Sequence, residues 1–106
     1  MSADFRKMLE KLKKELQQLY GDRLDHMILY GSQARGDARP DSDVDILLVI
    51  KGEFNYMELL RRSDDLAASF SLENDIVISR AFVSDKDYME RQSPFLMNVR
   101  REGVAV

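Results

Sequence analysis

The sequence predicts an α/β fold, in which a small β-sheet is covered by helices. Three segments have the short apolar composition of strands, at residues 24–30, 44–50 and 75–80, and segments with helical spacing flank them. Strands that alternate with helices indicate a sheet with helices packed on its faces, although the pattern does not fix the strand order. The length of 106 residues suits one hydrophobic core, so we expect residues 1–106 to form a single domain.

The composition bounds the class of protein. Hydrophobic residues make up 44% and charged residues 33%, as in ordinary globular proteins. The net charge of −3 argues against binding of long nucleic acid by electrostatics alone, but a nucleotide can be neutralised locally. The absence of cysteine excludes disulfides and thiolate metal sites and fits a reducing cytoplasm. No apolar run approaches the roughly 20 residues that span a membrane, and no signal-peptide pattern is present, so we expect a cytoplasmic protein.

The N-terminal segment, residues 4–20, is predicted to form an amphipathic helix that ends near Gly21. Its apolar residues at helical spacing are Phe5, Met8, Leu9, Leu12, Leu16 and Leu19. Residues 24–30 follow as the first strand. We expect Tyr30, at the end of this strand, to pack beneath the turn that comes next.

The chain is organised around the segment that continues this strand, Tyr30-Gly31-Ser32-Gln33-Ala34-Arg35-Gly36. Glycine lets the backbone turn sharply and approach a ligand closely. The Ser32 hydroxyl and the amides of the following helical turn suit a phosphate group, although serine also caps helices. Arg35 could pair with that phosphate, or it could tie the next loop to Asp37 or Asp41.

A polar loop at residues 37–42 leads to Asp43 and Asp45 at the start of the second strand. Residues two apart on a strand share one face, so the two carboxylates lie together. They repel each other unless a cation lies between them, and their hard oxygens suit Mg²⁺. A phosphate-binding turn beside a divalent-metal site is equipped for chemistry on a nucleoside triphosphate. Arg39 in the loop could contact a phosphate or be solvated.

The second half of the chain predicts further helices and a third strand. Residues 55–71 begin with Asn55 and Glu58 in the pattern of a capping box and continue at helical spacing. Residues 75–80 form the third strand, which opens with Asp75 as the second strand opens with an acid. The remaining predicted elements are a short helix capped by Ser84, a helix from Ser93-Pro94 to Gly103, and a short strand at residues 104–106.

Gly31-Ser32-x-Ala34-Arg35-Gly36, followed by Ser42-Asp43-x-Asp45, resembles the signature of the DNA polymerase β-like nucleotidyltransferase superfamily. Within it, the pattern is most similar to the minimal nucleotidyltransferases, the small antitoxin partners of HEPN-domain toxins. The motif covers residues 31 to 45, and the order of elements matches over nearly the whole chain. The resemblance implies a small mixed β-sheet covered by helices, the DNA polymerase β-like nucleotidyltransferase fold.

The resemblance also implies roles for particular residues. Asp43, Asp45 and Asp75 are the implied catalytic carboxylates and the ligands of two Mg²⁺ ions. Asp75, with Glu73 as the nearby alternative, is also the implied base for the incoming hydroxyl. The implied nucleotide-binding residues are Gly31, Ser32 and Arg35.

The function that the resemblance implies is the transfer of AMP from ATP to a hydroxyl, a tyrosine, of a cognate HEPN toxin. Little of the chain remains to grip an acceptor, which favours a folded partner protein. One alternative is nucleotidyl transfer to tRNA or a small molecule, although the lack of a basic face counts against tRNA. Another is a non-catalytic antitoxin that acts by binding alone, which the presence of Ser32 and three acids disfavours. No motif reports the base preference, the stoichiometry with the partner or self-association.

Overall fold

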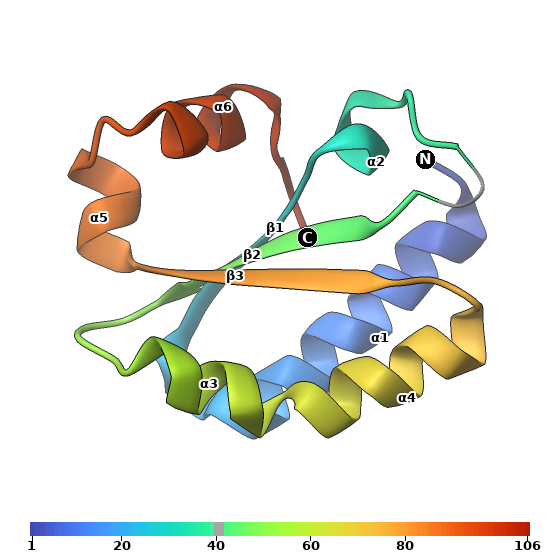
Figure 1. Cartoon of the computed structure of the whole chain (residues 1–106), viewed down its shortest axis with the longest axis horizontal. Helices are drawn as coiled ribbons and strands as arrows, with labels where there is room; N and C mark the ends of the chain where they lie inside the picture. Colours follow the sequence, from blue (N-terminus) through green and yellow to red (C-terminus); the bar gives the residue numbers. More distant parts are fainter. Residues whose placement is uncertain (40–41) are drawn as a thin grey trace.

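A computed structural model describes residues 1–39 and 42–106, and this part of the chain contains a four-stranded sheet with helices on both faces (Figure 1). The strands are β1 (Leu24–Tyr30), β2 (Val44–Ile50), β3 (Ile78–Ser84) and β4 (Val104–Ala105), in the order β3-β2-β1-β4. β1 is antiparallel to both β2 and β4, whereas β2 and β3 are parallel. The structure therefore confirms the predicted mixed sheet and supplies the strand order that the sequence left open.

Helices cover the two faces of the sheet unequally. Helices α1 (Ala3–Tyr20), α3 (Tyr56–Arg62) and α4 (Asp64–Asn74) lie along one face, below the sheet in Figure 1. They enclose the larger part of the core, to which β2 contributes Ile46, Leu48 and Ile50. The other face carries α2 (Ser32–Arg35), α5 (Asp85–Glu90) and α6 (Pro94–Glu102). A smaller cluster on this face contains Ile28, Leu47, Val49, Leu96 and Val99.

Strand β2 is buried along its whole length except at Asp45, which is partly exposed. Both faces are covered, as its continuous apolar run predicts. Successive side chains of a strand point to opposite faces, so Asp45 shares a face with Leu47 and Val49, the face that α6 covers. The candidate site therefore lies on the less covered face of the sheet.

Several predicted boundaries are confirmed within a residue or two, because local capping signals define them. The predicted strands at 24–30 and 44–50 coincide with β1 and β2. The side chains of Asn55, Ser84 and Ser93 each accept a hydrogen bond from the backbone N–H three residues later. No helix in residues 1–39 or 42–106 is long and apolar enough to cross a membrane.

The single helix predicted at residues 55–71 is wrong, because the chain forms two helices that meet at Ser63. Ser63 is fully buried, and its N–H bonds to the carbonyl of Leu60, three residues back, instead of continuing the α-helical pattern. Periodicity alone could not reveal this break, since the apolar positions continue across it. The break turns α4 to follow the sheet beside α1 (Figure 1).

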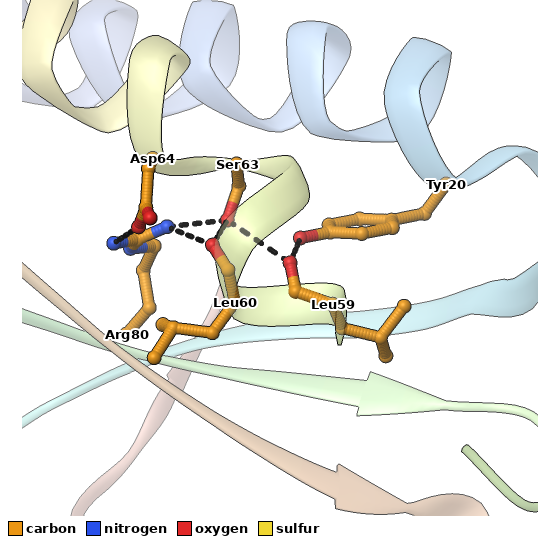
Figure 2. Close-up of polar contacts among 6 residues, drawn as sticks. All are labelled: Tyr20, Leu59, Leu60, Ser63, Asp64 and Arg80. Carbon is orange, nitrogen blue, oxygen red and sulfur yellow. Dashed lines mark hydrogen bonds and ion pairs between the residues drawn. The ribbon is translucent and has the colours of Figure 1, made fainter. Parts of the chain in front are cut away.

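Arg80 of β3 reaches into the junction between these two helices (Figure 2). Its guanidinium group donates to the carbonyl of Leu60 at 3.0 Å, to the carboxylate of Asp64 at 2.9 Å and to the Ser63 hydroxyl. Nearby, the Tyr20 hydroxyl donates to the carbonyl of Leu59 at 2.5 Å. Side chains of α1 and β3 thus donate hydrogen bonds to the carbonyl groups at the junction, and these bonds connect the helices to the sheet.

The predicted third strand is also shifted, because β3 begins at Ile78 and not at residue 75. Helix α4 runs to Asn74, and Asp75 ends it in the left-handed conformation with φ of 51°. Asparagine and aspartate are the non-glycine residues that tolerate this conformation, so Asn74-Asp75 is a helix end. The apolar residues from Ile76 to Ile78 resemble the start of a strand, which is why the sequence predicts one from residue 75.

We expect replacement of Arg80 by Met to lower the free energy of unfolding by about 1–2 kcal/mol, because buried polar groups at the helix junction lose their donor. Arg91→Met is the matched control, since Arg91 is exposed and its ion pair with Asp87 is long, at 3.9 Å. The control should change stability by no more than about 0.5 kcal/mol. Urea denaturation measures both, and equal effects would contradict the role given to Arg80.

Candidate active site

The site forms where β1 ends beside the start of β2. Tyr30, the last residue of β1, pairs with Asp45 in the antiparallel register. The next residue, Gly31, has φ of 74° and starts the short helix α2. A local turn from one strand and a carboxylate from its neighbour therefore meet at the same edge of the sheet.

Gly31 approaches the Asp45 side chain closely, so a larger residue here would have to displace the carboxylate. A Cβ atom built on Gly31 would collide with the Asp45 carboxylate. The positive φ of Gly31 independently favours glycine. The motif glycine is thus explained by two constraints, one from the backbone turn and one from the carboxylate beneath it.

The carboxylates of Asp43 and Asp45 concentrate negative charge at this edge. Asp43 is exposed, whereas Asp45 is partly buried. Burial of Asp45, followed by the charge of Asp43, raises the pKa of Asp45, and the opposing effect of Arg35 is smaller. Two adjacent carboxylates, one of them held in an unfavourable ionised state, are a donor set that suits a hard divalent cation such as Mg²⁺.

Ser79 of β3 occupies the third side of this group, which sequence reasoning missed. The parallel register pairs Ser79 with Asp45, and the Ser79 hydroxyl donates to the Asp43 carboxylate at 3.4 Å. Ser79 could be identified only once the start of β3 was known to be Ile78, because this start places Ser79 opposite Asp45. Ser79 contributes a neutral hydrogen bond where the prediction had placed a charged residue.

The structure does not bring Asp75 to Asp43 and Asp45, contrary to the prediction that it faces them. The register places Ser79, four residues later, beside Asp45, and β3 begins only at Ile78, so Asp75 lies outside the strand. Asp75 instead ends α4 and is exposed. Within residues 1–39 and 42–106, no three His, Cys, Asp or Glu side chains lie close enough to hold a metal ion. The predicted set of three carboxylates is therefore not assembled, and Glu73, inside α4, does not replace Asp75 in β3.

In the structure, Ser32 does not cap α2, and Arg35 pairs with acidic residues of the chain. Gly31, and not Ser32, is the N-cap of α2, and no side chain caps this helix. Arg35 pairs with Asp37 at 3.3 Å and with Glu102 of α6 at 3.5 Å. The alternative pairing with Asp41 lies outside the described residues. The side chain of Arg35 is about two-fifths exposed, so its further guanidinium donors are accessible to a ligand.

A family model described as a nucleotidyltransferase domain matches residues 9–96. The chain belongs to this nucleotidyltransferase family. The match spans β1, β2 and β3, and so includes Gly31, Asp43, Asp45 and Ser79. Enzymes of this family take a nucleoside triphosphate and generally use a divalent metal, which fits the paired carboxylates described above.

Similar sequences place the chain among the minimal nucleotidyltransferases. A predicted protein adenylyltransferase of Methanocaldococcus jannaschii is 38% identical over 72 residues, which cover 68% of this chain and 72% of that protein. A second one from the same organism is 32% identical over 98 residues and 92% of both chains. Protein adenylyltransferase MntA of Thermococcus cleftensis is 33% identical over 72 residues, 68% of this chain and 71% of that protein. The resemblance read from the motif is thereby confirmed.

Solved structures confirm the nucleotidyltransferase fold. A predicted nucleotidyltransferase from Sulfolobus solfataricus superposes with a TM-score of 0.60 at 22% identity, over 93% of this chain and 76% of that one. A chain of a toxin–antitoxin complex with AMP-PNP superposes with a TM-score of 0.63 at 17% identity, over 91% and 70%. At these identities the likeness concerns the fold alone.

The raised pKa of Asp45 predicts a pH-dependent effect of Asp45→Asn on stability. The folded protein keeps this proton to higher pH than the unfolded chain, so the stability that Asp45 contributes is complete at acidic pH. It is lost as pH rises through the folded-state pKa. In EDTA, the variant should therefore match the wild type at acidic pH and exceed its melting temperature at neutral pH. Adding Mg²⁺ should raise the melting temperature of the wild type more than that of the variant.

The control for this comparison is Asp65→Asn, which changes an exposed acid of α4. It should show neither the pH-dependent difference nor an altered response to Mg²⁺. Thermal melts across pH, with and without metal, provide the measurement. An Asp45→Asn variant that is less stable than the wild type at neutral pH in EDTA would contradict the electrostatic account.

The position of Asp75 predicts that Asp75→Asn retains catalytic activity. Asparagine also tolerates the left-handed conformation, so the free energy of unfolding should change by no more than about 0.5 kcal/mol. A general base contributes about 10²- to 10⁴-fold in rate, so a base at this position would show a far larger effect. Single-turnover transfer rates separate the two cases. Loss of transfer with intact Mg-ATP binding would restore Asp75 as the base.

Proposed function

We propose that the protein transfers AMP from ATP to a tyrosine hydroxyl of a HEPN-domain toxin and thereby acts as its antitoxin in the cytoplasm. The observation that carries this proposal is the packing of the Gly31-Ser32 turn against the Asp45 carboxylate, beside Asp43. Two of the relatives add support, one named as the protein adenylyltransferase MntA and one solved as a toxin–antitoxin complex with AMP-PNP.

In this proposal, one group of residues binds the phosphates and another binds the metal ions. In this proposal the Ser32 hydroxyl and the amides after Gly31 donate to the triphosphate, and Arg35 adds a cationic donor. Asp43 and Asp45 would hold two Mg²⁺ ions. When bound, these ions would neutralise the phosphates and stabilise the leaving pyrophosphate. The hydrogen bond from Ser79 positions Asp43 for this task.

The acceptor hydroxyl attacks the α-phosphorus, the bond between the α-phosphorus and its bridging oxygen breaks, and pyrophosphate leaves. Asp75 is not placed to remove the hydroxyl proton, so we propose that water or a group of the partner accepts it. Asp43 is exposed at the edge of the sheet, where an acceptor side chain can approach. A folded partner that presents a tyrosine fits this open geometry.

One experiment distinguishes the proposed acceptor from the alternatives. The protein is incubated with ATP labelled at the α-phosphate and Mg²⁺, together with a HEPN-domain protein encoded beside it, total tRNA, or buffer alone. We expect the label on the HEPN protein. Label on tRNA would favour the tRNA-modifying alternative, and toxin binding without any label would favour an antitoxin that acts by contact alone.

In the same assay, Asp45→Asn should lower the transfer rate by about 100-fold or more, because it removes a ligand charge from the metal. Asp65→Asn, remote from the site, should transfer at the wild-type rate. The rate of label incorporation under saturating ATP provides the measurement. Wild-type turnover by Asp45→Asn would refute the assignment of the site.

A further inference from the structure

A pocket of about 230 Å³ lies between α2 and α6, directly beside the candidate active site. Its lining residues are Tyr30, Gly31, Arg35, Phe95, Asn98, Val99 and Glu102. Gly31 belongs both to this pocket and to the turn over the Asp45 carboxylate. A molecule bound at the carboxylates could therefore extend into the pocket without leaving the protein surface.

Two aromatic rings form a corner of this pocket. The rings of Tyr30 and Phe95 are nearly perpendicular, at 88°, with their centroids 5.3 Å apart. Phe95 remains 44% exposed, although the next residue, Leu96, is buried. An exposed aromatic ring beside a polar site provides a stacking surface for a flat ligand.

The polar side chains that line the pocket include those of Arg35, Asn98 and Glu102. Glu102 pairs with Arg35 at 3.5 Å, which neutralises much of its charge. The Asn98 carbonyl oxygen accepts from the Arg101 guanidinium at 2.8 Å, which orients the amide. An ionised carboxylate only accepts hydrogen bonds, so it favours a base that presents an amino group, such as adenine, over one such as hypoxanthine that presents a carbonyl at that position.

We propose that this pocket binds the adenine base of the nucleotide, with Phe95 as the stacking surface and Glu102 as the acceptor that selects an amino group. The inference rests on the proposed function, since it assumes that the triphosphate lies at the Gly31-Ser32 turn. The pocket is smaller than the roughly 300–1,000 Å³ of sites that enclose a drug-sized ligand. It therefore suits one ring system of the nucleotide and not the whole molecule.

The lining of the pocket also differs from the phosphate-binding turn. Its carboxylate, Glu102, is paired with Arg35, a residue that the two regions share. The apolar walls formed by Phe95, Tyr30 and Val99 favour a flat, weakly polar ring. The neutral end of the nucleotide thus lies toward α6 and the charged end toward the N-terminus of α2.

The test compares ligands with and without the base. Dissociation constants for ATP, inosine triphosphate (ITP) and inorganic tripolyphosphate, each with Mg²⁺, are measured by calorimetry on the wild type, Phe95→Ala and Glu102→Gln. We expect Phe95→Ala to weaken ATP binding by about 5- to 100-fold and to leave tripolyphosphate binding unchanged. Glu102→Gln should reduce the preference for ATP over ITP by about 5-fold or more.

Met97→Ala is the matched control, because Met97 is an exposed apolar residue of α6 that does not line the pocket. It should leave all three dissociation constants unchanged. Thermal melts verify that the variants fold. If Phe95→Ala does not fold, Glu102→Gln still tests the pocket.

The possible failures are distinguishable. Equal wild-type affinity for ATP and tripolyphosphate would overturn the base pocket while leaving the proposed function intact. No binding of either ligand would overturn both. Unchanged ATP binding by Phe95→Ala and Glu102→Gln, with slower transfer to the protein acceptor, would assign the pocket to the acceptor and overturn the inference. An equal loss of ATP and tripolyphosphate binding in Phe95→Ala, without a change of base preference in Glu102→Gln, would also overturn it.

Discussion

The close approach of the Gly31 backbone to the Asp45 carboxylate is the constraint on which the rest of the site depends. It exists because β1 and β2 pair with Tyr30 opposite Asp45, so that the first residue beyond β1 lies above this side chain. A shift of one residue in the register would turn Asp45 to the opposite face, into the core. The motif glycine and the motif acid are therefore two parts of one contact, although they lie 14 positions apart in the chain.

The core holds this contact in place at an electrostatic cost. Every residue of β2 except Asp45 is buried, and the strand has helices on both faces, so the backbone that carries the carboxylate is rigid. Rigidity keeps Asp45 partly buried and beside Asp43, and burial first, then the Asp43 charge, disfavours its ionised form. A bound cation would convert this repulsion into binding energy, and a partner that binds only the folded state is stabilising. The same packing thus explains the raised pKa and the suitability for a metal.

The third side of the site departs from the three carboxylates that the family resemblance implies. Ser79 stands beside Asp45 in the parallel register, and Asp75 ends a helix. A serine can position Asp43 by a hydrogen bond, but at ordinary pH it offers neither a charge to a metal nor a base to a hydroxyl. In this arrangement Asp43 stays exposed, on the side from which the proposed acceptor would approach.

The sequence determined the elements whose signals are local. The Gly31-Ser32 turn, the pair Asp43 and Asp45, and the caps at Asn55, Ser84 and Ser93 follow from backbone conformation and hydrogen bonding within a few residues. Only the tertiary structure decided the strand order, the break at Ser63, the start of β3 and the pocket beside α6. Each of these depends on contacts between distant segments, such as Arg80 with Ser63 or Phe95 with Tyr30. Apolar periodicity does not predict these contacts, since it indicates which residues are buried and not which residues they pack against.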